Sequence, residues 1–125
     1  GFRHAPFSVD GCVILVKLHQ FKPGDTERLN IDTNTAQWLP GNGGLQVMPL
    51  HSFETESTAL VRWPAGEKFT PHQHRHGAEL YVIKGEFIDE HGRYPAGTWV
   101  RSPHLSSHHP DVEQETIIFI KTGHL

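Results

Sequence analysis

The sequence predicts an all-β fold, built either as a barrel or as a double-sheet jelly roll. Nine prolines and twelve glycines divide the 125 residues into short runs. These runs are rich in Val, Ile, Thr, Phe and Trp, which favour strands, and no long stretch keeps the period of a helix. Many short strands at such spacing are typical of closed or two-layered β-structures. The length fits one domain with a single apolar core.

Each expected strand is a short apolar or alternating run, and the first of them, "CVILVKL", is almost entirely apolar. In chain order, the expected strands are residues 12–18, 27–32, 46–53, 58–63, 68–71, 80–84, 86–89, 98–101 and 115–121. Turn residues separate them. "DEHGRYPAG" at residues 89–97 predicts a hairpin followed by a sharp re-entry. "WLPGNGGL" at residues 38–45 predicts a flexible loop or an internal boundary.

An internal repeat supports this reading of the chain. "HAPFSVDGCVILVKLHQF" (residues 4–21) can be laid without gaps on "HHPDVEQETIIFIKTGHL" (residues 108–125), at an offset of 104. His4 then falls on His108, and Lys17 falls on Lys121. On this interpretation residues 1–21 are the final strand of a preceding copy. Such a strand would complete this barrel's sheet or exchange with a second protomer.

The composition argues against several classes of partner. The formal net charge is −3 and the eleven Lys and Arg residues are scattered, so no basic stripe is available for nucleic acid or anionic lipid. No apolar run is long enough to span a membrane, and the N-terminus lacks the order of a signal peptide. We therefore expect a soluble, cytoplasmic protein. Cys12 is the only cysteine, which excludes an internal disulfide, and we expect its thiol to be buried.

Histidines gather in two segments, "TPHQHRHGAELYVIKGE" (residues 70–86) and "SSHHP" (residues 106–110). On an extended segment, residues i and i+2 point to the same side, so His72 and His74 can converge on one ion. Two imidazoles hold a metal weakly, and a further ligand must therefore come from elsewhere in the fold. A barrel that returns on itself would bring His108 or His109 beside this pair.

These segments carry a family resemblance. The pattern Gly66-x5-His72-x-His74, followed by "YVIKG" at residues 81–85, resembles the first motif of the cupin family. "YPAGTWVRSPHLSSHHP" at residues 94–110 is similar to the second motif, in which a Pro-x-Gly turn and a strand lead to a returning histidine. The stretches "VRWPAGEKF", "HQH", "GEFIDEHGRYPAGTWVRSP" and "SSHHP" most resemble ChrR-type cupins, which occur behind anti-sigma zinc segments and in bicupins.

The resemblance implies a double-stranded β-helix, the jelly-roll cupin barrel, as a single domain over residues 1–125. Residues 1–21 resemble the final strand of a preceding cupin copy, so the chain resembles the second copy of a bicupin with the tail of the first. By motif position, the implied metal ligands are His72, His74 and His108. His109 alternates with His108 and should face away, unless the turn at Pro110 breaks the alternation.

One position departs from the cupin pattern. The usual motif carries a ligating Glu four positions after the second His, where this sequence has Ala78. Glu79 follows one residue later, and on a regular strand it would point to the opposite face. A bulge between Gly77 and Leu80 would return it to the site. Glu79 and His76 are thus candidates for a fourth site member and for catalytic proton transfer, although a solvated His76 fits the sequence equally well.

Three imidazoles would leave open positions on one divalent transition metal, Zn or Fe, with Ni and Cu as alternatives. The resemblance extends to three-His iron dioxygenases that cleave diketones or hydroxyketones. It thus implies a small dioxygenase-like enzyme acting on a small oxygenated organic substrate. One alternative is a non-enzymatic ChrR-like metal or ligand sensor, although no anti-sigma His and Cys cluster occurs in the sequence. The other alternative is a structural fragment of a bicupin. We also expect a homodimer, because such cupins often pair through their outer sheets.

Overall fold

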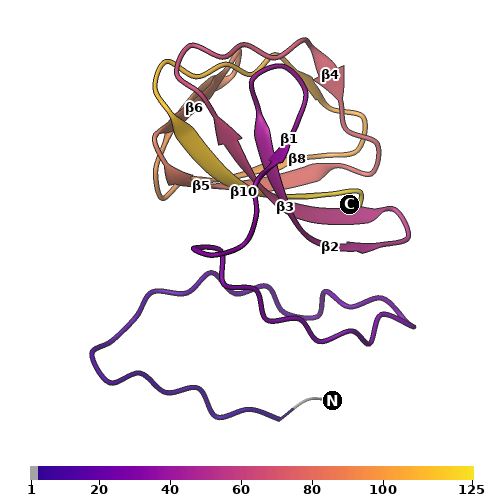
Figure 1. Ribbon diagram of the computed structural model, residues 1–125. Helices are drawn as coiled ribbons and strands as arrows, with labels where there is room; N and C mark the ends of the chain where they lie inside the picture. Colours follow the sequence, from indigo (N-terminus) through magenta and orange to yellow (C-terminus); the bar gives the residue numbers. More distant parts are fainter. Residues whose placement is uncertain (1–2) are drawn as a thin grey trace.

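The computed structural model describes residues 3–125 and divides them into two unlike regions (Figure 1). Residues 3–38 form an extended arm with turns but no strand. Residues 39–125 carry all the strands of the described chain. No helix occurs in residues 3–125, which confirms the predicted all-β class, and therefore no described helix could cross a membrane. The division between the regions falls within residues 38–45, where the sequence predicts a loop or boundary.

The main sheet has six strands in the order β1-β2-β3-β10-β5-β8. Their bounds are Leu39–Pro40 (β1), Gln46–Phe53 (β2), Glu56–Trp63 (β3), Ala78–Lys84 (β5), Trp99–Ser102 (β8) and Thr116–Thr122 (β10). All pairings in this sheet are antiparallel. β10 is central because it pairs with β3 along one edge and with β5 along the other.

Short strands make up the other layer of the barrel (Figure 1). β4 (His72–Gln73) pairs with β9 (Ser107–His108), and β6 (Glu86–Asp89) pairs with β7 (Gly92–Pro95). The core contains Leu45, Trp63, Leu80, Val82, Phe87, Val112 and Ile118. This two-layered, antiparallel arrangement around one core confirms the predicted jelly roll.

Most barrel strands begin and end within two residues of the expected bounds. The strand expected at residues 68–71 is wrong, because Lys68 makes only an isolated bridge and β4 begins at His72. The hairpin expected within residues 89–97 is present, and its returning half is strand β7. These differences arise where pairing extends over only two to four residues and leaves a weak pattern in the sequence.

The strands expected at residues 12–18 and 27–32 are wrong, because both segments lie in the arm as irregular, exposed chain. Val13 is 98% exposed, and the Cys12 side chain is exposed rather than buried as expected. A strand needs a neighbour to accept and donate its backbone hydrogen bonds, and the described structure places none beside residues 12–18. Residues 1 and 2 of the segment that resembles a preceding copy lie outside the described residues.

Strand β5 alternates regularly at the start, with Ala78, Leu80 and Val82 buried and Glu79 facing the opposite side. Its register with β10 shifts only after Val82, so no bulge interrupts the pairing from Ala78 to Val82. Gly85 ends the strand with φ of +80°, and a Cβ atom there would clash with the Glu115 carbonyl oxygen. The turn between β5 and β6 therefore requires glycine.

Candidate metal centre

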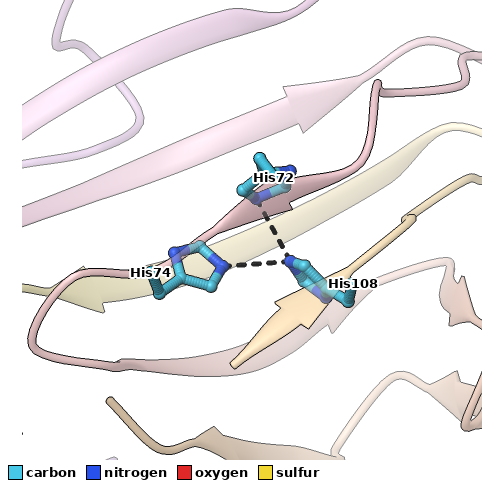
Figure 2. A group of neighbouring side chains, drawn as sticks. All are labelled: His72, His74 and His108. Carbon is cyan, nitrogen blue, oxygen red and sulfur yellow. Dashed lines mark hydrogen bonds between the residues drawn. The ribbon is translucent and has the colours of Figure 1, made fainter. Parts of the chain in front are cut away.

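Strand pairing brings the two histidine segments together. In the β4–β9 ladder His72 lies directly opposite His108, although the two are far apart in the sequence. Their Nε2 atoms are 3.2 Å apart. Figure 2 shows the His72 ring, from β4, directed toward the His108 ring, from β9.

His74 lies just beyond β4 and completes the group. Its backbone continues the pairing, since its N–H donates to the Ser106 carbonyl at 3.1 Å and its carbonyl accepts from Leu105 N–H at 2.9 Å. Its Nε2 atom lies 3.0 Å from Nε2 of His108 (Figure 2). One ring nitrogen from each of the three histidines lies within 4.8 Å of the others. The structure thus gathers the three residues that the sequence singles out as metal ligands.

Hydrogen bonds at Nδ1 orient two of the three rings. His72 Nδ1–H donates to the Thr70 carbonyl at 3.1 Å, and His108 Nδ1–H donates to Asp89 Oδ2 at 3.4 Å. Because a carbonyl and a carboxylate can only accept, each of these Nδ1 atoms carries the proton. The neutral rings then present an unprotonated Nε2 to the centre of the group, as a metal ligand requires.

The surroundings favour the neutral forms of His74 and His108. Burial, together with the neighbouring His108 and His72, lowers the pKa of His74 to about 4. Burial also lowers the pKa of His108, aided by His72 and opposed by the Asp89 carboxylate. Phe69 packs edge-on against His72, with ring centroids 5.1 Å apart. Burial and like-charge repulsion thus both disfavour the imidazolium forms of His74 and His108 at neutral pH.

Glu79 does not join the three histidines. Its carboxylate pairs with Lys17 from the arm and lies 3.1 Å from Nε2 of His124. Burial raises the pKa of Glu79, but the bonds from Lys17 and His124 outweigh it and lower the pKa overall. Ala78, whose position carries the ligating Glu in the usual cupin motif, is buried on the core face. The geometry therefore matches the regular-strand expectation for Glu79.

The other candidate histidines also lie outside the group. His76 occupies the turn before β5 with φ of +59°, and its ring stacks at 5.2 Å from that of His104. His109 is exposed, and its backbone N–H donates to Glu90 at 2.9 Å. The structure places His108, rather than His109, beside the pair, because the strand alternation continues through β9.

Sequence reasoning missed Asp89 and Tyr94, which stand behind His108. Tyr94 O–H donates to Asp89 Oδ1 at 3.0 Å, and burial together with this carboxylate raises the pKa of Tyr94. Both residues lie in the β6–β7 hairpin, in the segment expected to be a turn. Nothing in the linear pattern indicates that this hairpin packs against the returning histidine.

The donor set fits a divalent transition metal. Two neutral imidazoles whose Nδ1 atoms are protonated bring their Nε2 lone pairs within 3.2 Å of each other, an arrangement that a shared cation stabilises. Elsewhere, two cavities of about 330 and about 720 Å³ lie between the arm and the outer face of the main sheet, and none of the three histidines lines either of them.

Comparisons with known proteins agree with this architecture. A chain of the complex of Rhodobacter sphaeroides SigE with the anti-sigma ChrR is similar, with 25% identity and a TM-score of 0.66 over 73% of this chain and 51% of that chain. This protein therefore spans about half the length of that relative. An acetylacetone dioxygenase from Acinetobacter johnsonii is similar in fold, with 22% identity and a TM-score of 0.66, over 77% of this chain and 72% of that one.

An RmlC-like cupin from Shewanella frigidimarina shares the fold at 18% identity with a TM-score of 0.69, over 79% of this chain and 93% of that one. A comparison with curated protein sequences finds no match. The family model of the ChrR cupin-like domain matches residues 26–125, which include the whole barrel and all three clustered histidines. The chain therefore belongs to the ChrR cupin-like domain family, and its fold is that of a jelly-roll cupin.

Proposed function

We propose that His72, His74 and His108 hold one divalent transition-metal ion. The observation that carries this proposal is the convergence of three Nε2 atoms while two of the rings are anchored at Nδ1. Zn, Fe, Ni and Cu all suit imidazole ligands. A bound ion would supply Lewis acidity and open positions at which a substrate oxygen or dioxygen can bind.

We further propose that the protein is an enzyme of dioxygenase type acting on a small oxygenated organic substrate, such as a β-diketone or a hydroxyketone. The fold likeness to an acetylacetone dioxygenase supports this substrate class. The replacement of the usual motif Glu by Ala78 also supports it, since the site then has three neutral ligands. The role of the chain is to hold the rings, to line the site with Phe69 and Phe87, and to keep Asp89 behind His108.

Elemental analysis of protein purified without an affinity metal tests the first step. We expect about one equivalent of Zn, Fe, Ni or Cu per chain. His74→Ala should abolish retention of the metal, and His109→Ala is the matched control that should keep it. A metal-free wild-type protein that also fails to bind added Zn²⁺ or Fe²⁺ would disprove the metal site.

Oxygen consumption by iron-loaded protein tests the second step. We expect uptake of dioxygen that depends on a β-diketone or hydroxyaryl ketone and is lost in His74→Ala. Proton transfer by Glu79 or His76 is a separate proposal, which Glu79→Gln and His76→Ala test in the same assay. Because Glu79 pairs with Lys17 and His124, and the His76 ring lies beside that of His104, we expect little loss of rate. That result would contradict proton transfer by either group.

A ChrR-like sensor is the second candidate function, and the similarity to the SigE–ChrR complex favours it. In that case, metal or ligand binding would alter a contact with a protein partner rather than support turnover. Metal retention without oxygen uptake across a broad substrate panel would favour the sensor. A structural fragment of a bicupin would show neither property.

We also propose that the protein pairs as a homodimer, as expected from the sequence. The exposed apolar side chains of the arm support pairing, because monomers rarely expose large contiguous apolar surface. The similarity of residues 4–21 to residues 108–125 supports the interpretation of residues 1–21 as the tail of a preceding cupin copy. Sedimentation at micromolar concentration should show a dimer, and a monomer alone would contradict pairing. A cytoplasmic location stays a prediction.

A further inference from the structure

We propose that Asp89 is a positioning residue that sets the tautomer of His108 and so prepares its Nε2 for a metal; this inference rests on the proposed metal site. The Asp89 side chain is only 5% exposed, and its Oδ2 atom lies 3.4 Å from His108 Nδ1. A buried carboxylate needs hydrogen-bond donors, and His108 supplies one.

The two carboxylate oxygens of Asp89 accept hydrogen bonds from different partners. Oδ1 accepts three hydrogen bonds, from Tyr94 O–H at 3.0 Å, His91 N–H at 2.9 Å and Gly92 N–H at 3.2 Å. These donors belong to the β6–β7 hairpin and fix the rotation of the carboxylate. Oδ2 is thereby left directed at His108, which is its one hydrogen-bond partner within the described chain.

The fixed carboxylate determines which ring nitrogen of His108 carries the proton. Because a carboxylate accepts, Nδ1 must donate, and Nε2 is left with its lone pair directed at His72 and His74. A carboxylate behind a histidine also raises the basicity of the ligating nitrogen. Loss of such a partner commonly weakens metal binding about 10–100-fold. The β6–β7 hairpin would thus strengthen metal binding through His108 without supplying a metal ligand itself.

Asp89→Asn tests the inference, because it replaces the hydrogen-bond acceptor that faces His108 Nδ1 with a donor. The amide oxygen can keep the three bonds of Oδ1, whereas the NH₂ group then faces His108 Nδ1 and favours the opposite tautomer, with the proton on Nε2. An amide flip would instead point NH₂ at the N–H groups of His91 and Gly92, which disfavours it. We expect Zn²⁺ affinity, measured by chelator competition, to fall at least 10-fold.

Glu115→Gln is the matched control. It removes one negative charge from an exposed ion pair with Lys84 and should leave Zn²⁺ affinity unchanged within about 2-fold. Tyr94→Phe removes one donor from Oδ1 and leaves the carboxylate in place. It should weaken Zn²⁺ binding less than Asp89→Asn does, because the two backbone N–H groups still hold Oδ1.

Long-range ¹H–¹⁵N spectra of the histidine rings separate a failure of this inference from a failure of the metal site. In metal-free wild-type protein we expect the neutral His108 ring to carry its proton on Nδ1, and in Asp89→Asn on Nε2. An Nε2–H tautomer in the wild type would overturn the inference, even if the variant does not fold. Equal Zn²⁺ affinities in the wild type and in folded Asp89→Asn would also overturn the inference. A wild type that binds no metal yet shows the Nδ1–H tautomer would disprove only the metal site.

Discussion

Residues 12–18 in the arm and residues 116–122 in the barrel have similar apolar patterns but opposite environments. The repeat alignment places one segment on the other, yet Ile14 is 67% exposed whereas its counterpart, Ile118, is 2% exposed. Residues 116–122 form β10, which pairs with β3 on one side and β5 on the other. Within residues 3–125, no strand pairs with the arm segment. An apolar run therefore becomes a strand only where the fold supplies a neighbouring strand to pair with it.

The lysines of these two segments show the same contrast. Lys121 in β10 is buried and binds Glu56 at 2.8 Å. Lys17, its counterpart in the repeat alignment, reaches from the exposed arm to Glu79 on the outer face of β5. Burial raises the pKa of Glu56, but Lys121 and Lys22 outweigh this effect and lower the pKa overall. One lysine position is therefore part of the packed sheet, and the other links the arm to its surface.

The largest expected difference comes from truncating one apolar side chain in each segment. Ile118→Ala should lower the free energy of unfolding by about 3 kcal/mol, because it opens a cavity in the core. Val13→Ala should change it by less than about 0.5 kcal/mol, since its side chain is already in water. Urea unfolding measures both values. Equal losses would mean that the arm is packed in solution, as it would be in a dimer.

Metal binding should stabilise the barrel and leave the arm unaffected. Zn²⁺ at one hundred times its Kd should raise the free energy of unfolding by about 2.7 kcal/mol, because only the folded barrel assembles the three histidines. His74→Ala should abolish this gain, whereas His109→Ala should retain it. Tryptic cleavage within the arm, followed by mass spectrometry, should proceed at the same rate with and without the metal. Protection of the arm by metal would contradict this separation.

The buried Glu56–Lys121 pair should contribute a smaller stabilisation that depends on pH. Glu56→Gln should cost about 2 kcal/mol at pH 7, since the buried lysine loses a charged partner. The folded-state pKa of Glu56 is below the ordinary value of 4.5, so the contribution is present above that pH and decreases as the pH falls below it. Chemical unfolding across this range checks the sign. A cost that is constant down to low pH would argue against the pair.

Of the two ion pairs, the smaller contribution is expected from the lysine of the arm. Lys17→Ala should cost less than about 1 kcal/mol, because its ion pair with Glu79 is partly exposed and screened by salt. The measured quantity is again the free energy of unfolding in urea, at low and at moderate ionic strength. A loss as large as that from Glu56→Gln would show that the arm is fixed to the sheet as firmly as β10 is.

Local pattern was sufficient for most of the barrel. The strands at residues 46–53 and 86–89 were predicted with their observed bounds, and the turn glycine Gly85 follows from the motif. Three short strands, β1, β4 and β9, contain only two residues each, which is too little for a periodic signal. The expected strand at residues 12–18 failed for a different reason, since its composition suits a strand but no partner is present in the described chain.

The β class, the turns, and the placement of His72 and His74 on one side of an extended segment follow from the amino-acid sequence, because each depends on residues close together in the chain. Long-range packing instead brings His108 to this pair, turns Glu79 toward the arm, and places Asp89 behind His108. These relations depend on the register between strands that are distant in sequence. Such registers are set by the packing of the whole core, which no local pattern encodes.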